Sequence, residues 1–166
     1  MASFRNGPVE IAYLDEGEGE PIVLIHGFAS TKEINWVTPG WVAALTAAGR
    51  RAIALDNRGH GASSKLYDPL DYDRAVMADD VRALLDHLGL ARADVMGYSM
   101  GARIAANLTI ARPDRVRAPA SALRGRRWSA RCRSLQTAPT EEARAAQSRG
   151  LSPPAPQRRL PLRRRC

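Results

Sequence analysis

Gly97-Tyr98-Ser99-Met100-Gly101 is the stretch of the chain that decides the fold. It follows the short apolar run Asp94-Val95-Met96, and it opens a run in which Ile104, Leu108 and Ala111 share one helical face. A chain that passes at once from strand to helix holds the residue between them on a tight turn. Glycines two residues to either side of the serine remove the side chains that would collide there. The pattern predicts a strand–turn–helix elbow with Ser99 at its tip.

A serine on such a turn indicates nucleophilic chemistry. Its hydroxyl attacks poorly unless a base takes the proton and a rigid backbone holds it toward the substrate. The first N–H groups of the helix have no partner within the helix, so the N–H of Met100 can face a developing oxyanion. We expect the second donor to be the N–H of Phe28, in the loop that follows an earlier buried strand.

The three histidines of the chain all precede Ser99. His60 is the most plausible substitute base, with Asp56 four residues before it, but we expect both to stabilise a loop, because a base must reach the serine hydroxyl. His26 is expected to pack behind the oxyanion loop. His87 is expected at the surface, on the flank of a helix.

Along the region before and around the elbow, segments with strand-like apolar patterns alternate with segments that have the apolar spacing of a helix. Apolar runs or alternation predict strands at residues 9–13, 22–25, 52–55 and 94–96. Helical spacing predicts helices at residues 41–48, 81–88 and 104–111. The order favours a mostly parallel α/β sheet with helices on both faces, whose ligands bind beyond the carboxyl ends of the strands. We interpret Asp79, Asp80 and Asp86 as a solvated helix face.

The net charge of +8 lies entirely in the last part of the chain. Residues 117–166 hold 13 arginines against two glutamates, and they contain no Val, Ile, Phe or Tyr. They also hold six of the eleven prolines. This composition predicts a poorly structured basic tail rather than strands or helices. Arginines attract nucleic acid, but no stacking platform or motif accompanies them, so we expect no nucleic-acid partner.

Three segments, in this order, resemble the α/β-hydrolase fold family in its serine esterase and haloperoxidase-like branch: His26-Gly27-Phe28, Asp56-Asn57-Arg58-Gly59-His60-Gly61 and the elbow. The resemblance covers residues 3–116. It implies that Ser99 is the nucleophile and that Phe28 and Met100 supply the oxyanion donors. It also implies a structural loop in which Asp56 and Arg58 tie down the turn and the glycines permit it. The structural residues are then His26, Gly27, Asp56, Arg58, Gly59 and His60.

The same resemblance implies further elements after the nucleophile helix, and the sequence shows no pattern that predicts them. The family follows the nucleophile helix with another strand, and later with a catalytic Asp and His. Here Arg117-Ala118 runs into Pro119, and no aspartate follows Asp114. We expect a partial domain at 1–116, an Arg/Pro/Ala-rich tail at 117–166 read out of frame or disordered, and an elbow strand with an open edge. The serine excludes the branches that resemble this chain but place aspartate there, namely haloalkane dehalogenases and epoxide hydrolases.

The sequence therefore indicates a serine hydrolase of small ester-like substrates, acting by acyl transfer, with little or no activity in this chain. The alternative is a non-catalytic fragment or interaction module that carries the basic tail. We expect no metal or cofactor, because Cys132 and Cys166 lack the spacing of metal ligands. No signal peptide or membrane-spanning run is evident, so we expect a cytoplasmic protein without a membrane partner. Its substrate and its oligomeric state stay open.

Overall fold

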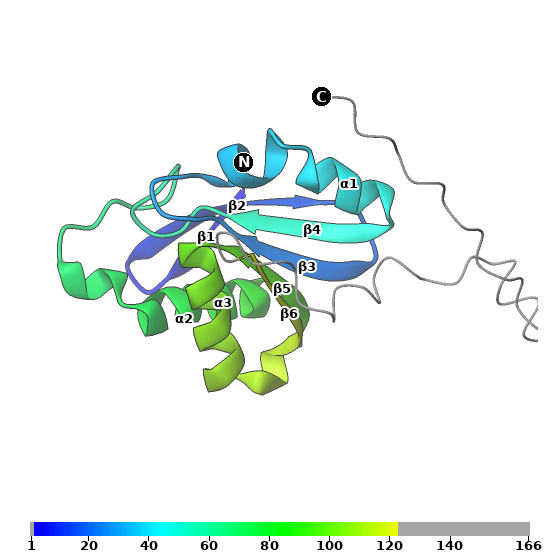
Figure 1. Ribbon diagram of the computed structural model, residues 1–166. Coiled ribbons are helices and arrows are strands. Elements are labelled where there is room, and N and C mark those ends of the chain that lie inside the picture. Colours follow the sequence, from blue (N-terminus) through cyan, green and yellow to red (C-terminus); the bar gives the residue numbers. More distant parts are fainter. Residues whose placement is uncertain (1, 123–166) are drawn as a thin grey trace, which may run out of the picture. The chain divides into compact units, whose positions relative to one another are not determined.

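Residues 2–122 are described by a computed structural model, in which six strands form one sheet in the order β1-β2-β4-β3-β5-β6 (Figure 1). The strands are β1 (Ala2–Asn6), β2 (Val9–Glu16), β3 (Glu20–Ile25), β4 (Arg50–Leu55), β5 (Ala93–Tyr98) and β6 (Val116–Ala122). The first two strands pair antiparallel, and the pairs among β3, β4, β5 and β6 are parallel. The predicted class, a mostly parallel sheet with helices, is confirmed.

Helices connect the parallel strands. They are α1 (Trp41–Ala47), α2 (Arg74–His87) and α3 (Met100–Ala111), with a π-helical turn η1 (Glu33–Val37) and the 3-10 turns η2 (Pro69–Tyr72) and η3 (Pro113–Arg115). Helix α1 lies on one face of the sheet, and α2 and α3 lie together on the other (Figure 1). α1 connects β3 to β4, α2 connects β4 to β5 across β3, and α3 connects β5 to β6, so each step between parallel strands is a helical crossover.

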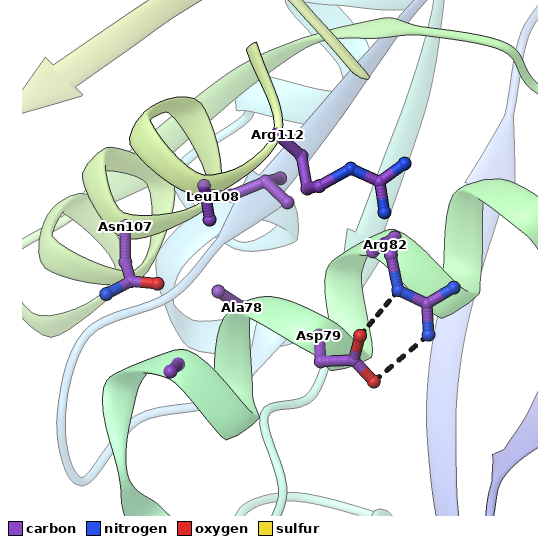
Figure 2. A pocket seen from close by; sticks show the side chains of 8 residues that line it. Ala78, Asp79, Arg82, Asn107, Leu108 and Arg112 are labelled. Carbon is purple, nitrogen blue, oxygen red and sulfur yellow. Dashed lines mark hydrogen bonds and ion pairs between the residues drawn. The ribbon is translucent and has the colours of Figure 1, made fainter. Parts of the chain in front are cut away.

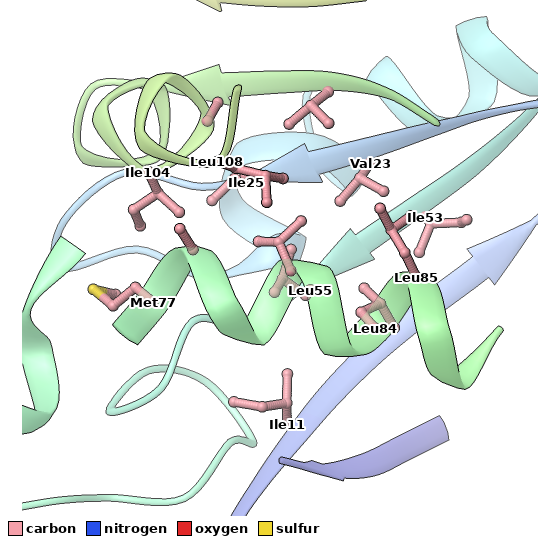
Figure 3. Packing of buried hydrophobic residues seen from close by; sticks show 14 of the residues in the cluster. Ile11, Val23, Ile25, Ile53, Leu55, Met77, Leu84, Leu85, Ile104 and Leu108 are labelled. Carbon is pink, nitrogen blue, oxygen red and sulfur yellow. The ribbon is translucent and has the colours of Figure 1, made fainter. Parts of the chain in front are cut away.

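The main core lies between the sheet and the pair α2–α3. It combines alternate residues of the strands with one stripe of each helix, including Val23, Ile25, Ile53, Leu55, Leu84, Leu85, Ile104 and Leu108 (Figure 3). The intervening residues Ile22 and Leu24 point to the opposite face and are buried as well. Burial on both faces explains why β3 reads as an unbroken apolar run.

The sheet begins one strand earlier than the sequence predicts. β1 pairs with β2 through a two-residue loop, in which Gly7 has φ +60° and Asn6 faces Val9 across the pair. A positive φ at the first loop position is what tight hairpins need and what glycine supplies. Gly7-Pro8, with glycine at the first loop position, was therefore an available signal for this hairpin.

Helix α2 also begins earlier than the predicted stripe at residues 81–88. The carboxylate of Asp73 accepts a hydrogen bond from the N–H of Ala75 at 2.7 Å and so caps the helix. An aspartate in this position satisfies one of the N–H groups that a helix start leaves without a partner. The predicted stripe covers only the second half of the helix.

The expectation of an open edge on β5 is wrong. β6 pairs in parallel with β5 over Val116–Ala122, with one irregularity in the register, although the sequence was expected to leave the sheet at residue 117. Parallel pairing uses the backbone, and Val116 and Ala120 are small enough to lie buried against the sheet. Pro119 is tolerated because β6 is the edge strand of the described sheet. The rest of the expected tail, residues 123–166, lies outside the described residues.

An ion-pair cluster holds β6 to the sheet at the amino ends of the strands. The buried carboxylate of Asp94 on β5 accepts from Arg117 Nε at 2.9 Å and Nη2 at 3.0 Å. It also accepts from Arg50 Nη2 on β4 at 2.5 Å. Arg117 forms a further ion pair with Glu20 on β3. The carboxylate of Asp94 on β5 therefore links β4 and β6 to its own strand through two arginines.

Replacing Asp94 with Asn should weaken the attachment of β6. The two arginines would keep their charges and lose their shared counter-charge, so we expect the free energy of unfolding to fall by about 1–3 kcal/mol. Urea denaturation measures this change. Asp114→Asn is the matched control, because that carboxylate is exposed and meets Arg112 only at 3.3 Å. An equal effect of both substitutions would contradict the role given to Asp94.

Candidate active site

Ser99 lies between the end of β5 and the first residue of α3. Its backbone has φ 53° and ψ −107°, a conformation that residues other than glycine rarely adopt. Strained residues of this kind cluster at functional sites, where the surrounding structure enforces them. The structure thus places Ser99 on a strained turn at the carboxyl edge of the parallel sheet, and its hydroxyl makes no hydrogen bond to any described residue.

The glycines on either side of the turn lie where no side chain fits. A Cβ atom on Gly101 would overlap the carbonyl oxygen of Ile25 and come within 2.7 Å of that of His26. A Cβ atom on Gly97 would collide with the backbone of Gly101 and lie 2.6 Å from Ala102 N. Both obstacles are main-chain atoms, which cannot rotate away. The lack of room for a side chain at Gly97 and Gly101 explains the G-x-S-x-G spacing.

The two expected oxyanion donors lie at the same edge as Ser99. Met100 is the first residue of α3, so its N–H has no acceptor within the helix. Phe28 follows Gly27 in the loop after β3, and a Cβ on Gly27 would lie 3.4 Å from Ser99 Cβ. The loop therefore passes Ser99 at van der Waals distance. The ring of Phe28 is 77% exposed beside the site.

His26 is buried behind this loop, and both its ring nitrogens are engaged. Nε2 lies 3.0 Å from the N–H of Asn57, which can only donate, so Nε2 accepts. Nδ1 then carries the proton and donates to the carbonyl oxygen of Gly27 at 2.7 Å. Burial holds the pKa of His26 below its ordinary value, chiefly because the charged ring would lose its hydration. This neutral ring has no free nitrogen to serve Ser99.

Asp56 connects two loops through its buried carboxylate. Oδ1 accepts from the N–H of Lys32 at 2.9 Å, and Oδ2 accepts from Lys32 Nζ at 2.7 Å and from the N–H of Ala62 at 3.0 Å. Burial by itself would raise the pKa of Asp56, but the hydrogen bonds from Lys32 and Ala62 outweigh it, so the pKa is lowered. The sequence singled out Asp56 and missed Lys32, since an isolated lysine in a loop normally reads as solvated.

Arg58 forms a buried, two-pronged ion pair with Asp80 on α2. Nε and Nη2 of Arg58 each lie 2.7 Å from a carboxylate oxygen of Asp80. The hydrogen bonds that Arg58 donates to the Asp80 carboxylate raise the pKa of Arg58 further above its ordinary value. The interpretation of Asp80 as part of a solvated face is therefore wrong: its side chain is buried and also accepts from Asn6 at 3.0 Å. Asp79 and Asp86 pair with Arg82 nearer the surface.

His60 and Gly59 lie in the same loop as Arg58. Nδ1 of His60 is 2.9 Å from the carbonyl oxygen of Arg58, and its ring packs edge-on against His26 at 5.2 Å and Phe28 at 6.0 Å. Gly59 has φ +77° and lies against the ring of Tyr72. The structure thus brings His60 beside the oxyanion loop, without a hydrogen bond to Ser99.

His87 lies apart from these residues, at the end of α2. Its ring stacks on Phe4 at a centroid distance of 5.4 Å, and Nε2 lies 3.2 Å from the hydroxyl of Tyr13. It is an exposed residue of a small aromatic cluster that joins α2 to β1 and β2. None of the three histidines is therefore hydrogen-bonded to Ser99.

A pocket of about 210 Å³ lies between α2 and α3, away from the elbow (Figure 2). Asp79 and Arg82 of α2 and Asn107 and Arg112 near the end of α3 line it. A helix rises about 1.5 Å per residue, so Asn107 is about 12 Å along the axis from Ser99. This pocket does not belong to the candidate site.

Within residues 2–122, no three His, Cys, Asp or Glu side chains are grouped so that they could hold a metal ion. In the same part of the chain, no helix is long and apolar enough to cross a membrane.

Comparison with known proteins finds a family whose model covers the elbow and the strands around it. The family model described as alpha/beta hydrolase fold matches residues 20–122. A segment of 101 residues is 41% identical to the non-heme chloroperoxidase CPO-A1 of Kitasatospora aureofaciens, covering 61% of this chain and 34% of that protein.

Solved structures show the same likeness. Epoxide hydrolase A from Mycobacterium thermoresistibile superimposes with a TM-score of 0.67 and 31% identity, over 72% of this chain and 37% of that one. Est816, described as an N-acyl homoserine lactone degrading enzyme, does so with a TM-score of 0.63 and 37% identity, over 71% and 43%. The chain thus spans less than half the length of each of these relatives.

Relief of the strain at Ser99 should stabilise the fold. Ser99→Gly removes the side chain that disfavours φ 53°, whereas Ser99→Ala removes only the hydroxyl and keeps the strain. We expect the glycine variant to exceed the alanine variant by about 1 kcal/mol in free energy of unfolding. Chemical denaturation of both variants measures the difference. A glycine variant less stable than the alanine variant would show that the turn is not strained.

The contribution of the charged Asp56 carboxylate to the stability of the fold should disappear at acidic pH. Because the folded-state pKa is lowered, the stability that this carboxylate contributes is present above its ordinary pKa of 3.8 and is lost as the pH falls through the folded value. We expect the wild-type chain to be more stable than Asp56→Asn at pH 7. The difference in stability between the two chains should become smaller below about pH 4. Unfolding midpoints measured at several pH values test this, and a gap that stays constant down to pH 2 would contradict it.

Proposed function

The chain belongs to the alpha/beta hydrolase fold family, and on that premise we propose that it derives from a serine hydrolase in which Ser99 attacks small ester-like substrates. The observation that carries the proposal is the strained backbone of Ser99, held between two glycines that admit no side chain. Such a turn presents a hydroxyl to the substrate edge at a cost in stability, which a merely structural serine would not need.

The proposed reaction is acyl transfer through the two backbone donors. Ser99 Oγ forms a bond to the carbonyl carbon, its proton passes to a base, and the carbonyl oxygen becomes an oxyanion facing the N–H groups of Phe28 and Met100. The ester bond then breaks, and the departing alkoxide takes the proton and leaves as an alcohol. Water hydrolyses the acyl-serine to the acid and restores the hydroxyl.

The choice of an ester-like substrate rests on the nucleophile. The resemblance to the family implies aspartate at this position in the epoxide-cleaving branches, so serine favours an acyl substrate despite the likeness to epoxide hydrolases. The likeness to Est816, whose named substrate is a lactone and so a cyclic ester, points to the same class.

Within the described residues, none of the three histidines is hydrogen-bonded to Ser99 as the base of this reaction would be. No histidine follows Ser99 in the sequence. His26 has both nitrogens engaged, His60 bonds to Arg58 and His87 lies at the far end of α2. We therefore propose that this chain acylates slowly and has little or no turnover. Oxyanion donors alone sustain on the order of 10³–10⁴-fold acceleration over water in intact serine enzymes.

The region after β6 is proposed to be a separate, non-catalytic tail. The family match and the last described strand both end at residue 122, and the following residues are rich in Arg, Pro and Ala. A shift of reading frame in GC-rich DNA would produce this composition. The nucleotide sequence tests the idea: an aliphatic strand encoded in another frame after this point supports it, and its absence from both frames excludes it.

Labelling with a fluorophosphonate tests the proposed nucleophile. The phosphonyl group reacts with an activated serine and stays attached, so mass spectrometry locates it. We expect slow labelling of Ser99, none in Ser99→Ala, and an unchanged rate in His60→Ala, because His60 is given no part in proton transfer.

Other outcomes would change the proposal in definite ways. Loss of labelling in a folded His60→Ala variant would contradict this account, and would give His60 a role either as the base or through the packing of its ring on Phe28. A folded wild-type chain that takes up no label would exclude the nucleophile and favour an interaction module carrying the basic tail.

A further inference from the structure

The loop that carries Phe28 is anchored at two points. We call residues 26–37 the strap; it leaves β3 at His26 and ends with η1. At its start, the N–H of Gly27 donates to Asn35 Oδ1 at 2.8 Å, and Asn35 N–H in turn donates to the carbonyl of Thr31 at 3.1 Å. At its middle, Lys32 is bound by Asp56. The Phe28–Ala29 turn is held between these anchors.

The second anchor is a buried ion pair. The side chains of Lys32 and Asp56 are 2% and 0% exposed, and Nζ lies 2.7 Å from Oδ2. Lys32 Nζ also lies 2.9 Å from Glu33 Oε1, at the start of η1. Removing two charges from water costs several kcal/mol, and an apolar pair of similar volume often stabilises a fold equally well or better. Stability alone therefore does not account for this pair.

The pair joins the strap to the loop that follows β4. Asp56 binds the main chain of Lys32 as well as its ammonium group, and through Ala62 it closes its own loop. Its neighbour Asn57 donates to His26 Nε2, and His26 donates to the carbonyl of Gly27. That carbonyl belongs to the same peptide unit as the N–H of Phe28. In a trans peptide the two point in opposite directions, so holding the oxygen aims the N–H.

We propose that Lys32 and Asp56 are positioning residues, which hold the strap so that the N–H of Phe28 faces the reacting atoms at Ser99. This inference rests on the proposed function for the role of Ser99, but the placement of the strap can be tested without it. Neither residue touches substrate. They act by fixing the strap and the loop after β4 in one relative arrangement.

Hydrogen exchange tests the positioning directly. Lys32→Met removes the charge and keeps most of the hydrocarbon stem. We expect amide exchange in the strap to rise at least about tenfold, while peptides from β3, β4 and β5 keep their protection. The matched control is Arg51→Met, which breaks the exposed ion pair with Asp15 on the same sheet and leaves the strap alone. An unchanged strap, or a uniform rise across the sheet, would overturn the proposal.

A second variant separates positioning from stability. Lys32→Met alone leaves the buried Asp56 carboxylate without its counter-charge, whereas Lys32→Met with Asp56→Asn removes both charges of the pair. We expect the double variant to recover the melting temperature lost in Lys32→Met, but not the protection of the strap. Recovery of both would show that the pair acts only on stability.

Fluorophosphonate labelling adds the chemical consequence. Corrected for the folded fraction, the rate at Ser99 should fall at least about tenfold in the double variant, because a misplaced oxyanion donor contributes little. Equal rates in this variant and in the wild-type chain would overturn the positioning role while leaving the nucleophile intact. A wild-type chain that is never labelled would instead contradict the proposed function, and hydrogen exchange would still decide the inference.

Discussion

The direct contact between the backbone of α3 and the end of β3 is the constraint on which the rest of the structure depends. Gly101 lies against the carbonyl oxygens of Ile25 and His26 with no room for a side chain between them. A helix can approach a strand this closely only if it starts as soon as β5 ends, which forces Ser99 into its strained conformation. Because the strap leaves β3 at the same point, Phe28 and the serine are brought to one edge of the sheet.

Periodicity and the elbow spacing predicted most of this architecture, because both report on burial. The four predicted strands and three helices are present where two buried faces or one apolar stripe made them visible. β6 escaped prediction for the opposite reason. Its residues are small or charged, and what holds it is backbone pairing together with the ion pairs of Arg117. β1 was missed because its hairpin signal, Gly7-Pro8, is a turn rather than an apolar pattern.

The charged residues of the site show the same limit more sharply. The sequence shows that Asp80 and Lys32 carry charge. It does not show that each forms an ion pair with a residue more than 20 positions away in the chain. Burial of a charge is decided by its partner, and the partner is known only once the fold is known. The elbow glycines could be read correctly because their reason for being glycine is local. The ion pairs that hold the surrounding loops could not.

The strand order also bears on how the chain emerges during synthesis. β3 is central and pairs with β4 and β5, whereas the preceding strand β2 lies beside β4. The hairpin made first therefore cannot cover β3. About 70 residues separate the end of β3 from the end of β5, and at about 5–20 residues per second their synthesis takes about 4–14 s. For that time the apolar run Ile22–Ile25 has an unpaired edge in the nascent chain, and such an edge is open to pairing with other strands.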